Sequence, residues 1–349
     1  MPVHNVIPAT LTNQFRIRLV TLVTLMTRAS IGAALLLLAA GACRPMPRAS
    51  SSSTGGPATA GDRPVRLLSL SGPITRADAE LSALAWHGDT LVLVPQYPHR
   101  FGDVLFTLEK STILDWLDGR TTAPLVPGTL SIDTTELQKI PGYEGLEALA
   151  VVGRRFVFTI EASPAGMDSY VVAADLEEDG RTLRLEANAL VSCPTPVQLR
   201  NKSFESLLAV VDGFVALYEA NGARVNPKPV AAVFDRDLAR RGSVPFPSIE
   251  YRITDATSLD ADGRFWAINT FWLGDLHLLP DVHHSVEQLV ELRWTGAAVE
   301  RTPTPPIRLQ RLSALETRNW EGLARLDDRG FLLASDKFPE TFLGFVGLP

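Results

Sequence analysis

Polar and apolar residues follow the same order at five places along the chain. Each stretch begins near an acidic residue, continues as an alternating apolar run, turns at Gly or Asp, and returns as a second apolar run that ends at a polar residue. Two short apolar runs on either side of such a turn predict a β-hairpin. The five stretches are residues 79–96, 143–161, 204–219, 254–269 and 319–337.

The acids that open these stretches recur at intervals suited to a propeller. Successive acids are 64, 61, 50 and 66 residues apart, which is long for helical repeats and fits propeller blades with inserted loops. The opening acids are Glu80, Glu144, Glu205, Asp255 and Glu321, and the closing polar residues are Gln96, Glu161, Glu219, Asn269 and Asp336.

Further strands are predicted after each hairpin. The candidates are residues 104–109, 128–132, 169–176, 182–191, 230–234, 248–253, 287–294, 306–312 and 341–347. The last hairpin is followed by one strand only, whereas a strand at 65–71 has no hairpin before it. Pairing 65–71 into the last blade would close the ring and remove a sheet edge. We therefore predict an all-β fold, a β-propeller of five four-stranded blades closed by the N-terminal strand. Six blades is the alternative, and residues 110–135 are alternatively a helical insertion.

The N-terminal region has the pattern of a targeting segment. A basic residue, Arg28, precedes an apolar run over residues 31–42, which is too short for a stable membrane span and suits the core of a signal peptide. Gly41 and Ala42 stand directly before Cys43, as in a bacterial lipobox. We predict a signal peptide over 1–43 with a lipid on Cys43, and translation from Met26 is an alternative start. Ordinary signal cleavage and an internal apolar helix are the other interpretations.

A tether and a folded domain follow the targeting segment. Residues 44–64 are rich in Ser, Gly and Pro without apolar periodicity, which predicts a flexible linker, and residues 65–349 form the domain. The predicted protein is therefore extracytoplasmic, in the cell envelope, with its lipid in a membrane. The remaining cysteine, Cys193, lies in a strand-like segment, so a core position is the simpler interpretation.

Composition limits the classes of partner. The chain has 349 residues, of which 46% are hydrophobic, so it can bury a sizeable core. Its formal net charge of −6 does not suggest a nucleic-acid partner. The sequence has no oligomer signal, so a monomer is the expectation. G-x-S-x-G, P-loop, G-x-G-x-x-G and zinc Cys/His patterns do not occur.

Three of the hairpins carry a motif that resembles a known family. The segments Y-E-G-L-E-A-L-A, N-K-S-F-E-S-L-L and N-W-E-G-L-A are similar to the blade motif of phytase-like propellers, the domain described as "esterase-like activity of phytase". The hairpins at Glu80 and Asp255 depart from that motif. The resemblance implies a propeller with acidic residues at the mouth of its channel, where phytases hold calcium ions that bind phosphate.

A ring of acids has two chemical interpretations. Residues at one place in every blade converge on the axis, and hard oxygen ligands at that density suit Ca²⁺. The candidate ligands are Glu80, Glu144, Glu205, Asp255, Glu321, Glu161, Glu219 and Asp336. Alternatively, the bases that precede three of the acids by three residues neutralise the ring without metal; these are Lys202, Arg252 and Arg318.

Two functions follow from these interpretations. The first is a metal-dependent phosphoesterase for small phosphorylated substrates, in which Lys202 and Arg318 clamp the phosphate of an anionic ligand. The second is a non-catalytic propeller of the cell envelope that binds a ligand or a protein at the same face.

Overall fold

Strands make up most of the regular structure. The computed structural model describes residues 61–271, 275, 278, 284–312, 317–337 and 340–348. Within these ranges α1 (Lys110–Leu117) is the one α-helix, and it occupies the first part of the segment that we considered as a helical insertion. No helix in the same ranges is long and apolar enough to cross a membrane. The predicted all-β class is confirmed.

The hairpins and the strands that follow them form repeating units. Unit 1 contains β2 (Leu81–His87), β3 (Thr90–Pro95), β4 (Val104–Glu109) and β5 (Gly128–Ile132). Unit 2 contains β6 (Tyr143–Val152), β7 (Arg155–Ala162), β8 (Asp168–Leu176) and β9 (Thr182–Leu185), with β10 (Val191–Ser192) beside β8. Unit 3 contains β11 (Phe204–Val210), β12 (Gly213–Tyr218), β13 (Val230–Asp235) and β14 (Arg240–Pro245).

The last two units complete the propeller. Unit 4 contains β15 (Arg252–Ala256), β16 (Arg264–Phe271), β17 (Val286–Trp294) and β18 (Val299–Arg301), with β19 (Ile307–Arg308) also paired to β17. Unit 5 contains β20 (Trp320–Leu326), β21 (Gly330–Ser335) and β22 (Leu343–Gly347), and its outer strand is β1 (Arg66–Leu68). β1 pairs antiparallel with β22, with Arg66 opposite Phe345 and Leu68 opposite Leu343. The predicted closure by the N-terminal strand is confirmed.

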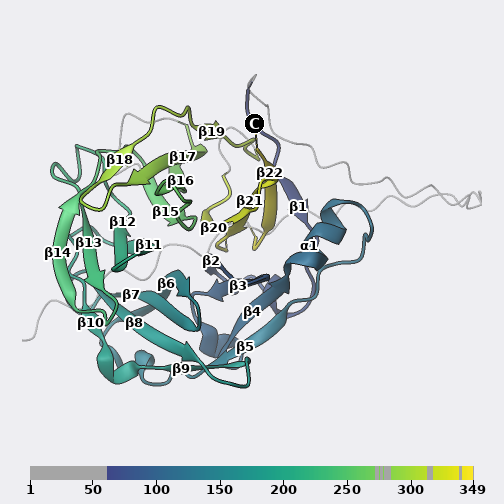
Figure 1. The fold of residues 1–349 in the computed structure, drawn as a ribbon, viewed down its shortest axis with the longest axis horizontal. Helices are drawn as coiled ribbons and strands as arrows, with labels where there is room; N and C mark the ends of the chain where they lie inside the picture. Colours follow the sequence, from purple (N-terminus) through teal and green to yellow (C-terminus); the bar gives the residue numbers. More distant parts are fainter. Residues whose placement is uncertain are drawn as a thin grey trace, which may run out of the picture. The chain divides into compact units, whose positions relative to one another are not determined.

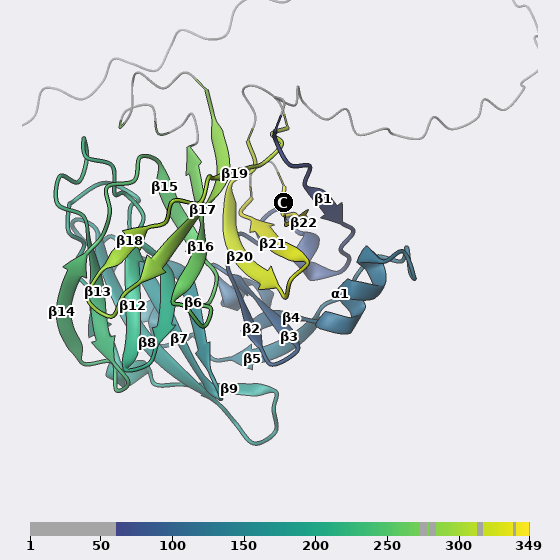
Figure 2. The same cartoon turned by 45° about the horizontal axis from the view of Figure 1, so that its top comes forward.

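The innermost strand of each unit lies beside the innermost strands of its two neighbours. In order around the axis these strands are β2, β6, β11, β15 and β20, and Figure 1 shows them at the centre. The turned view of Figure 2 shows β20 near β2, where the last unit meets the first. β5 also pairs with β9 in parallel, which joins units 1 and 2 into one hydrogen-bonded sheet. Strand pairing therefore gives four sheets, and the blade count of five stays a prediction.

Two outer strands lie where the sequence analysis did not place them. Unit 3 ends with β14 at 240–245 instead of 248–253, and unit 4 has β18 at 299–301 and the short β19 instead of one strand over 306–312. Most side chains of β14 are exposed to solvent. An edge strand with no buried face has no apolar alternation, and periodicity cannot find it.

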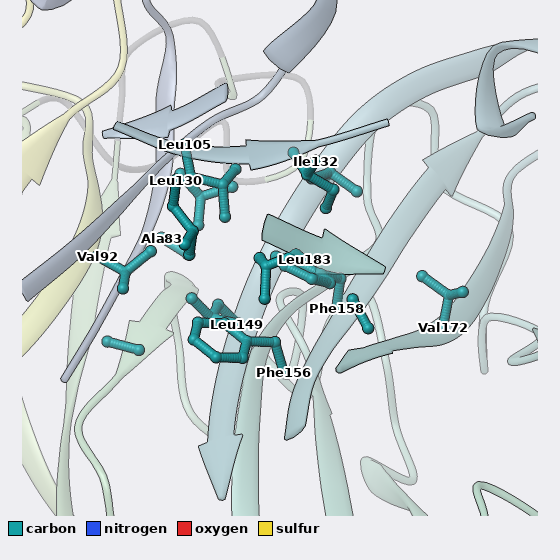
Figure 3. Close-up of a cluster of buried hydrophobic side chains, with 14 of the residues drawn as sticks. Ala83, Val92, Leu105, Leu130, Ile132, Leu149, Phe156, Phe158, Val172 and Leu183 are labelled. Atoms are coloured by element: carbon teal, nitrogen blue, oxygen red, sulfur yellow. The ribbon is translucent and has the colours of Figure 1, made fainter. Parts of the chain in front are cut away.

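Apolar clusters fill the spaces between neighbouring units. Figure 3 shows the one between units 1 and 2, where Leu105 and Leu130 of unit 1 face Phe156 and Phe158 of unit 2. Leu105, Phe156 and Phe158 are completely buried. Within the described residues, similar clusters lie between each other pair of neighbouring units. Each sheet is thus buried on both faces, and burial of each large side chain contributes about 1.5–3 kcal/mol.

Asp255 connects three of the innermost strands. It belongs to β15, and its Oδ2 accepts hydrogen bonds from the backbone N–H of Leu84 in β2 at 3.3 Å and of Leu323 in β20 at 2.7 Å. Its Oδ1 accepts from the N–H of Ala256 at 2.7 Å. Innermost strands have one edge without a neighbouring strand, so these N–H groups need another acceptor. Asp255 therefore has a structural role at the axis.

We expect Asp255→Ala to lower the free energy of unfolding by about 3 kcal/mol, because it leaves three buried N–H groups without their acceptor. Urea denaturation followed by tryptophan fluorescence measures the loss. Asp262→Ala, at an exposed acid of the same unit, is the matched control and should stay within about 0.5 kcal/mol of the unchanged protein. Equal stability of the two variants would contradict the structural role of Asp255.

Candidate functional site

Every innermost strand carries a β-bulge at the corresponding place. In β11 the bulge lies between Phe204 and Ser206, which pair with the adjacent residues Tyr218 and Leu217. A bulge adds one residue to a strand and redirects its side chain. The residues at the bulges are Ser82 in β2, Glu147 in β6, Glu205 in β11, Asp255 with Thr254 in β15, and Glu321 in β20.

In two units the bulge carries a different residue from the one that we predicted for the ring. We predicted Glu80 and Glu144 at the equivalent positions, whereas the structure places Ser82 and Glu147 there. The sequence contains the signal for this register. Glu147 stands 14 residues before Glu161, the same spacing as in units 3 and 4, whereas Glu144 stands 17 residues before it. We missed Glu147 because the E-G-L motif pointed to the first of two glutamates.

The closing polar residues share one register relative to the bulges. Each one pairs with the residue two positions before the bulge of its unit. The backbone N–H of Glu219 donates to the carbonyl of Ser203 at 3.0 Å, and that of Asp336 donates to the carbonyl of Asn319 at 2.8 Å. Gln96, Glu161 and Asn269 occupy the corresponding positions in their units. These residues and the bulge residues therefore lie at one end of the innermost strands.

A small pocket opens at that end of the strands, and we call it the axial pocket. Its volume is about 170 Å³. Its walls come from all five units and from the loops between them. The lining residues are Gln96, Glu147, Glu161, Asn201, Lys202, Glu205, Arg252, Asp275, Asn319, Glu321, Asp336 and Lys337.

Arg252 is the hub of the axial pocket. Its Nη2 lies 3.0 Å from Glu205 Oε2 and 3.3 Å from Glu321 Oε1, and its Nε lies 2.5 Å from Glu219 Oε2. Its Nη1 donates to the side-chain oxygen of Asn319 at 3.3 Å. The guanidinium therefore joins carboxylates from units 3 and 5 to unit 4. Sequence reasoning proposed that Arg252 neutralises ring acids, and these ion pairs confirm that proposal.

Lys202 also lies in the axial pocket and is also paired. Its ammonium Nζ is 3.5 Å from Glu219 Oε2 and 3.4 Å from Asp275 Oδ1, and the side chain is 3% exposed. Burial raises the pKa of Glu219, but Lys202 and Arg252 more than offset this and hold that pKa below its ordinary value. Glu219 therefore carries the negative charge that both bases share.

In three other carboxyl groups the effect of burial prevails, and their pKa values are raised. Burial raises the pKa of Glu161 to about 8, and the neighbouring Glu219 adds to the rise. Burial and then Asp336 raise the pKa of Glu321 to about 8. Burial and then Glu161 raise the pKa of Glu147 well above its ordinary range. Glu161 therefore favours its protonated form near neutral pH unless a further positive charge enters the pocket.

Three carboxyl oxygens in the axial pocket lack a hydrogen-bond partner among the described residues. They are Oε1 of Glu161, Oδ2 of Asp275 and Oδ1 of Asp336, and all are buried. Glu147 is better satisfied because its Oε1 accepts a hydrogen bond from the side-chain amide of Gln96 at 2.7 Å. Buried acceptors without donors are costly, so these three oxygens mark the place where a donor group would be stabilised.

Five predicted site residues do not line the axial pocket: Glu80, Glu144, Asp255, Glu219 and Arg318. Glu219 is buried against Lys202, and Asp255 binds backbone N–H groups. Glu80 pairs with Arg100 at 3.3 Å and with Lys337 at 3.5 Å, and Glu144 accepts a hydrogen bond from the hydroxyl of Ser163.

Arg318 has a buried acid of its own. Its Nη1 lies 3.6 Å from Glu287 Oε2 and donates to the carbonyl of Gln310 at 2.8 Å. Burial raises the pKa of Glu287 to about 7, and Arg318 opposes the rise. Trp320 donates its indole N–H to the same carboxylate at 2.7 Å. In this geometry Arg318 is committed to Glu287 instead of an axial ligand.

The carboxylate oxygens of the pocket are the type of ligand that calcium prefers, but they are not arranged to hold one ion. Within the described residues, no three Asp, Glu, His or Cys side chains are placed to hold one metal ion. The carboxylates of Glu205 and Glu219 already face Arg252. The calcium site inferred from the family resemblance therefore stays a prediction, and we derive no chemistry through it.

Comparison with known proteins supports no family assignment. No protein-family model and no curated protein matches the chain. Among solved structures, the GH43 endo-arabinanase from Bacillus licheniformis is 11% identical over 80% of this chain and 96% of its own, with a TM-score of 0.43. The soluble aldose sugar dehydrogenase from Escherichia coli is 10% identical over 81% of this chain and 99% of its own, with a TM-score of 0.38. These likenesses carry no inference about activity.

The raised pKa of Glu161 predicts a pH dependence of stability. An acid whose pKa rises from 4.5 to about 8 on folding stabilises the folded state below about pH 4.5, and this contribution is lost as pH rises to about 8. Glu161→Gln removes this loss. Between pH 5 and pH 8 the free energy of unfolding of the variant should therefore rise by at least about 1 kcal/mol relative to that of the unchanged protein. Urea denaturation at pH 5 and pH 8, in the presence of a chelator, measures this difference.

Glu300→Gln, at an exposed position of β18, is the matched control and should leave the pH profile unchanged. If the free energy of unfolding changes with pH in the same way for Glu161→Gln and the unchanged protein between pH 5 and pH 8, Glu161 is ionised throughout that range. The surplus of uncompensated carboxyl groups would then be smaller than the geometry indicates.

Proposed function

We propose that this propeller binds a small cationic ligand in the axial pocket, such as an amine or an amino sugar. One observation carries the proposal: the pocket holds more carboxyl groups than its bases can neutralise. Six acids and three bases line it. The acids are Glu147, Glu161, Glu205, Asp275, Glu321 and Asp336, and the bases are Lys202, Arg252 and Lys337. A seventh acid, Glu219, is fully buried beside the pocket and contacts both Lys202 and Arg252.

An ammonium group would satisfy what the pocket lacks. It supplies up to three N–H donors, and Glu161 and Asp336 each have one buried oxygen without a donor. Its positive charge would favour ionised Glu147 and Glu161, so binding would release protons near neutral pH. The volume of about 170 Å³ fits one such group with a short carbon chain, and a larger ligand would extend outwards.

Phosphate is less well supported as the ligand group. Lys202 and Arg252 already contact Glu219, so a phosphate would have to compete with a buried carboxylate for both bases. It would also meet the buried oxygens of Glu161 and Asp336, which repel an anion when their carboxyl groups are ionised. The metal-dependent phosphoesterase predicted from the resemblance would need a rearranged pocket.

Hydrolysis by acid–base catalysis is the second candidate function. Glu161 and Glu321, with pKa values raised to about 8, would hold a proton at neutral pH and could donate it to a leaving group. Glu219, whose pKa is lowered, would stay ionised in the same pocket. A pair of carboxyl groups with opposite shifts suits proton transfer as well as binding.

Isothermal titration calorimetry with a panel of diamines, amino sugars and neutral sugars tests the proposal. We expect saturable binding of an amine-bearing compound, with proton release at pH 7 seen as heats that differ between buffers of different ionisation enthalpy. Glu161→Gln should weaken that binding at least about tenfold, because it removes a charge-assisted hydrogen bond. Glu300→Gln should bind as the unchanged protein does.

Other outcomes of the same experiment would contradict the proposal. If no amine binds and CaCl₂ binds at one site, the pocket is a calcium centre. If phosphate esters are hydrolysed with calcium and Glu205→Ala abolishes turnover, the phosphoesterase hypothesis is correct. Release of product from a neutral glycoside, lost in Glu161→Gln, would establish the second candidate.

We also propose that a lipid on Cys43 tethers the domain to a membrane of the cell envelope. The support is the apolar run over 31–42 that ends in Gly41-Ala42-Cys43; these residues lie outside the described ranges. We expect the full chain, expressed in bacteria, to incorporate labelled palmitate and to sediment with membranes. Cys43→Ala should lose both properties. Cys193→Ala, at a buried cysteine, is the control and should keep both. Labelling that persists in Cys43→Ala would contradict the tether.

A further inference from the structure

We infer a second ligand site, for an oxyanion such as a phosphate group, in a pocket at the edge of unit 4. Its volume is about 380 Å³, and its walls include Tyr251, His284, Ser285, Arg308 and Arg311. The site is independent of the proposed amine ligand. It differs from the axial pocket, where acids outnumber bases, because its two arginines equal its two acids in number.

Two arginines give this pocket free donors. Arg308 lies on β19 with an exposed side chain, which makes no ion pair or hydrogen bond in the part of the chain that the structure describes. Arg311 is half-buried, and its Nη1 donates to the carbonyl of Ser285 at 3.0 Å. A guanidinium has five N–H donors in a planar fork that matches the oxygens of phosphate. Both side chains therefore have donors left for a ligand.

Ser285 adds a buried polar group that points to a missing partner. Its hydroxyl is buried and has no hydrogen-bond partner among the residues that the structure describes, and the residue is only 2% exposed. Few buried hydroxyl groups in native proteins lack a partner. A hydroxyl group can donate to an anionic oxygen, so an oxyanion held by the arginines would satisfy it.

Tyr251 provides a separate sign of a built site. Its φ of 67° is in the left-handed region, which is unfavourable for a bulky residue and costs about 1–3 kcal/mol. Its ring packs against Phe271, with the ring centroids 5.7 Å apart. The strained backbone holds Tyr251 in the wall of this pocket and directs the next residue, Arg252, into the axial pocket.

The acids of this pocket are engaged by other groups. Glu287 lines it, but its carboxylate already accepts hydrogen bonds from the indole N–H of Trp320 and the backbone N–H of Arg318. Asp62 also lines it and has an interaction of its own. Within the described residues neither Arg308 nor Arg311 forms an ion pair, so both guanidinium groups keep their charge for an anionic ligand.

Calorimetric titration of the full chain with inorganic phosphate, at constant ionic strength set by NaCl, tests the inference. We expect saturable binding at one site, with sulfate competing. Arg308→Ala should weaken phosphate binding at least about tenfold, because it removes charge-assisted hydrogen bonds. Arg311→Lys and Ser285→Ala should also weaken it, and they keep the inference testable if a larger change at Arg311 impairs folding.

Arg240→Ala is the matched control, since it removes an exposed arginine from β14 and should leave phosphate binding unchanged. Glu161→Gln should also bind phosphate normally, which separates this site from the axial pocket. Heats of phosphate and sulfate no larger than those of chloride would overturn the inference. Full phosphate affinity in Arg308→Ala and Arg311→Lys would overturn it as well.

Discussion

The buried guanidinium of Arg252 is the interaction on which the centre of the propeller depends. One side chain from unit 4 holds Glu205 and Glu219 of unit 3 and Glu321 of unit 5. Removing one partner of such a buried pair typically costs about 3–5 kcal/mol, because it leaves an uncompensated charge. The ion pairs therefore fix how units 3, 4 and 5 meet at the axis. They also leave Glu147 and Glu161 of unit 2 without a base.

This asymmetry gives the axial pocket its chemistry. Asp255 accepts hydrogen bonds from backbone N–H groups of β2 and β20. Unit 1 has Ser82 at its bulge, so the ring does not consist of five equivalent acids. The positive charge is held at Arg252 and Lys202, which contact Glu219. Within the described residues Glu147 and Glu161 of unit 2 form no ion pair, and a donor-bearing ligand would bind beside them.

The same folding pattern separates positive from negative charge on this face. Arg318, which the sequence suggested for the axis, is held by Glu287 behind the wall, and Arg308 and Arg311 lie further out on unit 4. An acidic pocket and a basic pocket thus adjoin at Tyr251 and Arg252, which are consecutive in the chain. A ligand with both charges has complementary groups on either side of this point.

The sequence by itself determined the hairpins, the propeller class and the closure by the strand at 65–71, because buried strands must alternate apolar and polar residues. It also determined that acids cluster at one end, through the spacing of residues such as Glu205 and Glu219. Only the tertiary structure decided which acids share a pocket: β6 has two bulges, with Glu144 at the first and Glu147 at the second, and only Glu147 lines the pocket. It also decided which bases neutralise them. Which charged side chains pair depends on small differences in the distances between units. The spacing of residues along the chain does not encode those distances.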